Sequence, residues 1–388
     1  MRPTAALRAA IVVALAATVL STARGAQGAP VPPTPRPSER AVPALEVTVV
    51  ADDLDIPWDV RPIGGGRLLV TERGGELLLL KDGTRTTVDL VGARIWSSGE
   101  TGLMGLAVDP RFTKNRRFYT CSGWQSRSGA HDIRVIRWRL ADDRASARRQ
   151  QTLLTGLPTT TGRHGGCRLL IARNGALLVG TGDAATTAAP QTLRNLGGKT
   201  LRLDRRTGEA WPENPWSRAS GPRRYVFTYG HRNVQGLAQR ADGTLWSVEH
   251  GTYRDDEVNR LGAGRNYGWQ PGPGYDESPP MTDHSLPGRQ WDARWSSGEP
   301  TIATSGGAFL PTRGWGRLSG ALAVAALRGE HLRFLTFDKR GRLVRERVRL
   351  RGEYGRLRAV TVAPNGTLLV TTSNGAGADQ LLRVRPVR

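Results

Sequence analysis

Apolar and β-branched residues occur along this chain in short runs that end at turn residues, and long runs with helical periodicity are scarce after the first 30 residues. Short runs of this kind, in a chain with 48 glycines, predict an all-β fold. One unit recurs six times: an apolar strand, a turn that contains Gly, Asp or Asn, and a second apolar strand. The second strands are expected to begin near Leu68, Phe118, Leu177, Leu245, Leu322 and Leu368.

Consecutive repeats lie 46 to 77 residues apart, which is enough for about four short strands and their loops. A six-bladed β-propeller explains both this spacing and the length of the chain. Two β-sandwiches would not explain a repeat that covers the whole mature chain. We therefore expect a single propeller domain over residues 45–388, with ligand-binding groups on the loops at one end of its central channel.

The N-terminal segment is typical of a cleaved secretory signal peptide, which we predict over residues 1–28. Arg2 and Arg8 precede the apolar run AAIVVALAATVL, and small residues follow it. This run of about a dozen residues is too short to cross a bilayer, so no transmembrane segment is expected. A flexible Pro-rich leader is predicted over residues 29–44. The expected location is outside the cell or in the cell envelope.

Export would permit a disulfide bond, and the chain has two cysteines, Cys121 and Cys167. One bridge between them is the only intramolecular option. The sequence leaves open whether the fold brings them within bonding distance.

The formal net charge is +22, from 56 basic and 34 acidic residues. Nearly all the basic residues are arginines, and they are scattered along the chain. A nucleic-acid-binding protein would instead gather them on a basic helix or patch, so no nucleic acid is expected as a partner. A codon bias toward arginine explains the excess. Electrostatic association with an anionic cell envelope is the alternative.

Against this basic background, the segment SVEHGTYRDDEVNRLGAGRNYGW, residues 247–269, gathers four acidic residues: Glu249, Asp255, Asp256 and Glu257. Glycine-containing turns with carboxylates and free backbone carbonyls supply the oxygen ligands that Ca²⁺ prefers. The offsets do not match the EF-hand loop. Calcium on an irregular loop is one interpretation. The other is a solvated acidic turn whose carboxylates pair with Arg254 and Arg260.

Other candidate groups lie next to the predicted strands. His164 precedes a strand and Asp183 follows the next one, so an imidazole and a carboxylate could meet at the channel mouth and act as a general base. Arg232 could stabilise a developing oxyanion. Arg356 and Arg358 are two apart and share one face of a strand, where they could bind carboxylates of an anionic ligand. Each of these residues is also compatible with a structural or solvated role.

Nine motifs in order resemble those of the soluble pyrroloquinoline quinone (PQQ)-dependent aldose sugar dehydrogenases, the glucose/sorbosone dehydrogenase-like family. The resemblance runs from about Ile56 to Val384 and rests on SGETGLMGLAVDP, HGGCRL, GTGD, LGGKTLRLD, YGHRNVQGL, EHGTYRDDEVN with NYGW, PTIATSGGAF, ALRG and RLRAV. It implies a six-bladed propeller, in agreement with the repeat. It also implies oxidation of an aldose at its anomeric C1 hydroxyl to a lactone, with hydride transfer to PQQ and electrons passed to a soluble acceptor.

The resemblance implies a role for each matching residue. His164 would be the base that removes the proton of the anomeric hydroxyl, and Asp183 would hold and polarise its imidazole. Arg232 and Asn233 would contact the quinone, with Arg232 also stabilising the negative charge on the quinone oxygen. The remaining cofactor oxygens and carboxylates would be held by Glu100, Thr301, Arg328, Arg356 and Arg358.

The resemblance also implies two Ca²⁺ ions. The first would join the cofactor to the backbone carbonyls of Gly251 and Thr252 and act as a Lewis acid. The second, a structural ion, would use Glu257 and the carbonyl of Tyr267, with Asp256 nearby.

The chain departs from the family pattern at four positions. Cys167 replaces a glycine, so the loop behind His164 is either tied to Cys121 or packed differently. Thr252 replaces a proline, and Arg328 replaces a common lysine. Ala359 replaces an aspartate that could pair with the neighbouring arginines. None of these changes removes the predicted base or the metal turn.

Two other functions fit the sequence. One is a calcium-binding propeller without catalysis, which would bind carbohydrate or protein. The other is a calcium-dependent lactonase, in which the metal activates water. The sequence leaves open the preferred sugar, the natural electron acceptor, and whether the protein is a monomer or a homodimer.

Overall fold

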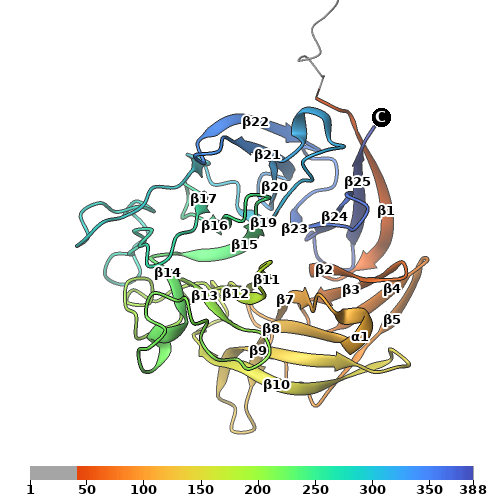
Figure 1. Ribbon diagram of the computed structural model, residues 1–388, viewed down its shortest axis with the longest axis horizontal. Coiled ribbons are helices and arrows are strands. Elements are labelled where there is room, and N and C mark those ends of the chain that lie inside the picture. The colour runs from red at the N-terminus through yellow and green to blue at the C-terminus, as the bar shows by residue number, and fades with distance from the viewer. Residues whose placement is uncertain (1–41, 388) are drawn as a thin grey trace, which may run out of the picture. The chain divides into compact units, whose positions relative to one another are not determined.

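The computed structural model describes residues 42–387, and regular structure in this range is almost entirely β (Figure 1). The predicted signal peptide and most of the predicted leader lie outside the described residues. The first strand, β1, spans Leu45–Leu54. Within residues 42–387, no helix is long and apolar enough to cross a membrane.

Six small sheets form the six blades of a β-propeller (Figure 1). Blade 1 consists of β2 (Pro57–Gly64), β3 (Arg67–Glu72), β4 (Leu77–Lys81) and β5 (Thr84–Thr87). Blade 2 consists of β7 (Leu103–Val108), β8 (Arg117–Gln125), β9 (His131–Leu140) and β10 (Ser146–Leu157), with β6 (Asp89–Val91) parallel to β10. Blade 3 consists of β11 (Arg168–Ile171), β12 (Ala176–Gly180), β13 (Lys199–Asp204) and β14 (Val226–Tyr229).

The second half of the ring has the same plan. Blade 4 consists of β15 (Asn233–Gln239), β16 (Leu245–His250), β17 (Glu257–Arg260) and β18 (Trp295–Ser296). Blade 5 consists of β19 (Thr304–Phe309), β20 (Leu322–Ala326), β21 (His331–Phe337) and β22 (Leu343–Arg349). Blade 6 consists of β23 (Leu357–Val362), β24 (Leu368–Thr372), β25 (Asp379–Pro386) and β1. The helical segments are α1 (Phe112–Asn115) and the 3₁₀ turns η1 (Pro222–Tyr225) and η2 (Gly316–Leu318).

The six predicted repeats correspond to the six blades, so the predicted fold class is confirmed. The second strand of each blade begins within one residue of its predicted start; these strands are β3, β8, β12, β16, β20 and β24. Each first strand, from β2 to β23, lies innermost in the ring (Figure 1).

The ring is closed by the two ends of the described chain. The N-terminal strand β1 pairs antiparallel with the C-terminal strand β25, with Leu45 opposite Pro386. Blade 6 therefore takes strands from both ends of the chain, and β1 covers an edge of β25 that would otherwise be unpaired.

The core consists of six apolar clusters, each between two neighbouring blades. Between blades 1 and 2, for example, Leu69 packs with Phe118 and Trp138, all of them fully buried. Both faces of each sheet are therefore covered by apolar side chains. Because such cores are close-packed, the sheets form a rigid frame for the loops at the ends of the channel.

A disulfide bond joins Cys121 in β8 to Cys167, immediately before β11, with a Cα–Cα distance of 5.9 Å. It answers the question that the sequence left open. The bond links blades 2 and 3 three residues after His164, and both cysteines lie in the apolar cluster between these blades. The loop that carries His164 is thereby tied to the frame.

We expect reduction of this disulfide to lower the free energy of unfolding by about 4 kcal/mol, because the bond closes a loop with a sequence separation of 46 residues. Urea unfolding followed with and without a reductant measures the difference. The Cys121→Ala/Cys167→Ala double variant should be as unstable as the reduced protein and insensitive to reductant. Equal stability of the oxidised and reduced proteins would contradict the prediction.

Candidate active site

The antiparallel pairing in blade 3 brings His164 and Asp183 together. Arg168 of β11 lies opposite Gly180 of β12, so the residues just before β11 and just after β12 meet at one end of the channel. The Nδ1 atom of His164 lies 2.9 Å from an oxygen of Asp183. The His164 side chain is 3% exposed and the Asp183 side chain is fully buried.

Asp183 is surrounded by hydrogen-bond donors. It accepts from the backbone N–H of Ala185 at 2.8 Å, the indole N–H of Trp269 at 2.8 Å and the hydroxyl of Tyr275 at 2.7 Å. An ionised carboxylate only accepts hydrogen bonds, so Nδ1 of His164 carries its proton toward Asp183. The Nε2 atom is therefore the one that can take a proton from a substrate.

A buried lysine fixes the loop that follows Asp183. Lys199 donates three hydrogen bonds to the backbone carbonyls of Ala189, Pro190 and Gly197, at 2.6 to 2.9 Å. Its burial lowers the pKa of Lys199 to about 7. Lys199 thus holds the loop after Asp183, and the three donors described above hold the Asp183 carboxylate itself. The carboxylate therefore has a fixed position beside the imidazole of His164.

Arg232 lies at the entry to blade 4, with 5% of its residue surface exposed. Its backbone N–H donates to Glu249 at 3.0 Å, and its guanidinium forms an ion pair with Glu277. The second oxygen of Glu249 binds Nδ1 of the buried His231 at 2.8 Å. These contacts hold the backbone of Arg232 at the channel mouth.

Glu100 and Asn233 connect this region to His164. One oxygen of Glu100 accepts from the backbone N–H of His164 at 3.1 Å and from the side-chain amide of Asn233 at 3.3 Å. Asn233 also accepts from the backbone N–H of Gly166 at 3.2 Å. The structure therefore joins both predicted residues to the loop that carries His164.

Arg356 and Arg358 converge on Ser373, as the shared strand face predicted. Arg356 donates to the Ser373 carbonyl and Arg358 to its hydroxyl, both at 3.1 Å. Burial, together with Arg168, Arg73 and Arg356, lowers the pKa of Arg358 to about 9. The neighbouring Ala359 is fully buried in the apolar cluster between blades 6 and 1.

Asp256 and Thr301 contact each other. The Thr301 hydroxyl lies 2.9 Å from both oxygens of Asp256, which also accepts from the backbone N–H groups of Gly251 at 3.0 Å and Ile302 at 2.7 Å. The Asp256 carboxylate therefore connects the turn at Gly251 to the loop that precedes blade 5, and fixes the position of the turn. Burial raises the pKa of Asp256.

The turn after β16 presents backbone oxygens. Within residues 42–387, the carbonyls of Gly251 and Thr252 accept no backbone hydrogen bond, and neither does the carbonyl of Tyr267. Thr252, which stands where the family pattern has a proline, is buried, with 9% of its surface exposed. The structure leaves these oxygens available as ligands.

Glu257 is buried opposite Glu249 in the β16–β17 pair. Burial and the charge of Glu249 raise the pKa of Glu257 well above its usual value. Asn259 donates to both carboxylates, at 2.7 Å to Glu249 and 3.0 Å to Glu257. In the part of the chain that the structure describes, no group of three or more His, Cys, Asp or Glu side chains could hold a metal ion.

The acid-rich stretch is therefore not a solvated turn, since Glu249, Asp256 and Glu257 are all buried. Pairing with a neighbouring arginine holds only for Asp255, whose carboxylate lies 3.4 Å from the guanidinium of Arg254. Arg328 is exposed, as are Glu100 and Arg356. It differs from the other predicted cofactor ligands because, within residues 42–387, its side chain forms no hydrogen bond or ion pair, whereas Glu100 binds His164 and Arg356 binds Ser373.

The sequence reasoning missed three residues that the structure places at the site. His250 ends β16, and burial, together with Arg232 and Arg358, lowers the pKa of His250 well below its usual value. The position of His250 inside the acid-rich stretch could have identified it as a candidate from the sequence. Tyr275 and Glu277 come from the long loop between β17 and β18, where no motif points to them.

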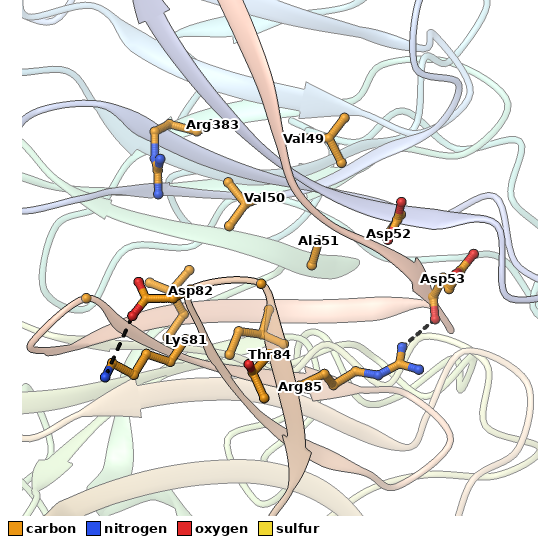
Figure 2. Close-up of a pocket in the computed structure, with 14 residues that line it drawn as sticks. Val49, Val50, Ala51, Asp52, Asp53, Lys81, Asp82, Thr84, Arg85 and Arg383 are labelled. Carbon is orange, nitrogen blue, oxygen red and sulfur yellow. Dashed lines mark hydrogen bonds and ion pairs between the residues drawn. The ribbon is translucent and has the colours of Figure 1, made fainter.

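A groove of about 700 Å³ lies elsewhere, between the second half of β1 and the β4–β5 hairpin (Figure 2). Its charged residues pair locally: Lys81 lies 3.7 Å from Asp82, and Arg85 donates to the carbonyl of Asp53 at 2.6 Å. None of the predicted site residues lines this groove. The channel mouth, where the chemically capable groups converge, is therefore the candidate active site.

The fold and this site define a class: a six-bladed β-propeller whose channel mouth combines a His–Asp pair with several arginines. The Glucose / Sorbosone dehydrogenase family model matches residues 54–383, and the chain belongs to this family. The aldose sugar dehydrogenase YliI of Escherichia coli (strain K12) is 31% identical over 358 residues, which cover 89% of this chain and 94% of that protein.

Solved structures of similar proteins agree with this family assignment. The PQQ-bound aldose sugar dehydrogenase of Streptomyces coelicolor has a TM-score of 0.73 and 30% identity, covering 89% of this chain and 99% of that one. An oxidoreductase (glucose dehydrogenase) of Thermus thermophilus has a TM-score of 0.76 and 34% identity, covering 88% of this chain and 100% of that one. The family predicted from the nine motifs is confirmed, and the chain is an enzyme of an oxidoreductase family.

Proposed function

We propose that this enzyme oxidises aldoses at the anomeric C1 hydroxyl to lactones, with PQQ as cofactor, Ca²⁺ as an aid to catalysis and a soluble electron acceptor. The observation that carries the proposal is the meeting of two kinds of group at one channel mouth. A His–Asp pair with a free Nε2 can remove a proton, and the arginines beside it suit an anion with several carboxylates.

The unpaired polar atoms around the channel fit such an anion. Buried side-chain atoms without a hydrogen-bond partner among the described residues include Arg168 Nη2, Arg232 Nε, His250 Nε2 and Thr252 Oγ1. Buried polar groups are normally paired, so unpaired ones in one region indicate a missing ligand. Burial and the neighbouring arginines lower the pKa of Arg358, and the carboxylates of a bound cofactor would offset both effects.

Arg356, Arg358 and Arg232 would hold the cofactor, with Asn233, Glu100 and Thr301 as additional polar contacts. Thr301 already donates its hydroxyl to Asp256 and its backbone N–H to the carbonyl of Tyr253, so a rotated side chain would have to serve. Arg328 would add a further positive charge, and within residues 42–387 its side chain has no hydrogen-bond or ion-pair partner to give up. Bound PQQ supplies a two-electron acceptor for the hydride that leaves C1.

The residues of the chain then perform the proton chemistry. Nε2 of His164 takes the proton of the C1 hydroxyl, and the negative charge of Asp183 stabilises the resulting imidazolium. The fixed contact from Nδ1 to Asp183 keeps Nε2 directed at the substrate. The guanidinium of Arg232 stabilises the negative charge that develops on the acceptor side.

The backbone carbonyls of Gly251 and Thr252 support a Ca²⁺ ion at the turn, because they are free of backbone partners and Asp256 braces the turn. A second ion would be held by Glu257 with the carbonyl of Tyr267, where it would offset the two facing carboxylates of Glu249 and Glu257. Both ions belong to the proposal.

Export from the cytoplasm is also part of the proposal. The layout of residues 1–28 supports it, and so does the Cys121–Cys167 disulfide, since such bonds persist in oxidising compartments. The net charge of +22 would favour retention on an anionic cell envelope at low salt.

The purified protein, reconstituted with Ca²⁺ and PQQ, should reduce a redox dye when glucose or another aldose is added. Omission of PQQ, and removal of Ca²⁺ with a chelator, are the controls, and each should abolish the reaction. No dye reduction across a broad panel of aldoses would overturn the proposal. Calorimetry that showed Ca²⁺ binding without affinity for PQQ would instead indicate the non-catalytic propeller.

A further inference from the structure

A tight turn from the long loop between β17 and β18 lies over the candidate active site. Gly272 and Asp276 pair across the turn, and the Asp276 carboxylate binds both the N–H and the hydroxyl of Ser278. The carbonyl of Ser278 accepts from Arg254 at 3.2 Å. We call residues 272–278 the mouth turn.

The mouth turn extends from His164 to Arg232. The hydroxyl of Tyr275 lies 2.8 Å from Nδ1 of His164, and two residues later Glu277 forms its ion pair with Arg232. In the proposed reaction, His164 and Arg232 both act near C1 of the sugar. A sugar held between them must therefore lie beside the mouth turn.

The residue before the proposed base also contacts this turn. Arg163 donates to Glu277 at 2.9 Å, and its guanidinium lies over the ring of Tyr275, 5.2 Å from the centroid. The same oxygen of Glu277 binds Arg163 and Arg232. The other oxygen of Glu277 has no hydrogen-bond partner within residues 42–387, and the Glu277 side chain is 27% exposed.

Glu277 keeps its negative charge in this position. Burial alone would raise the pKa of Glu277, but Arg232 and Arg163 outweigh it and the pKa lies below the usual value. The mouth therefore carries a fixed carboxylate that can accept hydrogen bonds from sugar hydroxyls. Beside it lies a guanidinium, that of Arg163, whose positive charge Glu277 neutralises.

We propose that Arg163 and Glu277 form a charge-paired wall of the sugar site that selects uncharged aldoses over uronic acids, an inference that rests on the proposed function. Glu277 offers an acceptor to neutral hydroxyls and repels a substrate carboxylate. As long as Glu277 is present, Arg163 is already paired and does not attract an acidic sugar.

The test compares glucose with glucuronate, which share the C1 hydroxyl and differ at C6, on one reconstituted preparation of each variant. The quantity measured is the ratio of kcat/KM for glucose to that for glucuronate, in which any change in cofactor loading cancels. We expect Glu277→Gln to lower this ratio about tenfold, because Arg163 is freed to bind the carboxylate. Arg163→Gln should raise the ratio, since the negative charge of Glu277 is then less neutralised and repels the carboxylate of glucuronate more strongly.

The matched control is Glu46→Gln, which breaks a similar ion pair with Arg385 on the outer strands of blade 6, where the two atoms lie 2.6 Å apart. Its ratio should equal that of the unmodified enzyme. A purely structural role of the mouth turn would not move the two test variants in opposite directions. Unchanged ratios in both, or glucuronate oxidation that stays undetectable in Glu277→Gln, would overturn the inference. An unmodified enzyme that oxidises no sugar would instead overturn the proposed function, and this inference with it.

Discussion

Replacement of His164 by alanine is expected to lower turnover of the reconstituted enzyme by about 1,000-fold or more, because the His164–Asp183 pair supplies the base that takes the proton of the C1 hydroxyl. Asp183 is fully buried and already accepts from three donors besides the imidazole. The proposed cofactor ligands, Arg356 and Arg358, lie on another blade. Cofactor absorbance after gel filtration should therefore stay near that of the unmodified protein.

The matched control for this variant is His284→Ala. The His284 side chain is 60% exposed and pairs with Asp292 at 2.8 Å, outside the candidate active site. It should retain full turnover. A His164→Ala enzyme that kept most of its rate would show that another group is the base.

Replacement of Arg358 by glutamine is expected to weaken PQQ binding by about 100- to 1,000-fold, the usual effect of removing one partner from a buried charge pair. Burial and the neighbouring arginines lower the pKa of Arg358 to about 9, and no ion pair among the described residues includes its guanidinium. An anionic cofactor would supply the missing partner. Titration of the apoprotein with PQQ, followed by absorbance, measures the dissociation constant.

Arg148→Gln is the control for the same titration, since Arg148 is an exposed residue of β10 in blade 2. It should bind PQQ as the unmodified protein does. The free energy of unfolding of the Arg358→Gln apoprotein should not fall, because the substitution relieves repulsion between this guanidinium and the neighbouring arginines. Unchanged PQQ affinity in Arg358→Gln would contradict the assignment of this residue.

The fold could be predicted from the sequence because the strand and turn patterns that define each blade lie close together along the chain. In blades 1, 3, 4 and 6 the first two strands are joined by a short turn, and Leu245, Leu322 and Leu368 begin second strands at their predicted positions. The His164–Asp183 contact followed from the same hairpin logic. The strand alternation likewise brought Arg356 and Arg358 to one place, beside Ser373.

The mouth turn could not be predicted in this way. Tyr275 contacts His164 across 111 residues of sequence, and Glu277 contacts Arg163 across 114. A contact of this kind depends on how a long loop folds back over the ring, which leaves no periodic signal in the sequence. The exposure of Arg328 is likewise a matter of tertiary placement.

Burial also decided the interpretation of the acid-rich stretch. Four carboxylates close in sequence fit a calcium loop, and they also fit a solvated turn. In the structure, Glu249 binds His231 and the backbone of Arg232, while Asp256 braces the turn at Gly251. These two acids thus hold backbone groups in place, which the sequence could not show.

The absorption spectrum of the protein reconstituted with PQQ and Ca²⁺, recorded before and after addition of glucose without any electron acceptor, tests the central claim most directly. The proposed function predicts that the spectrum of bound cofactor changes from the oxidised to the reduced form within one turnover. The change should be absent in His164→Ala, although that variant still binds PQQ. A bound cofactor whose spectrum no aldose alters would contradict the claim that this site oxidises sugars.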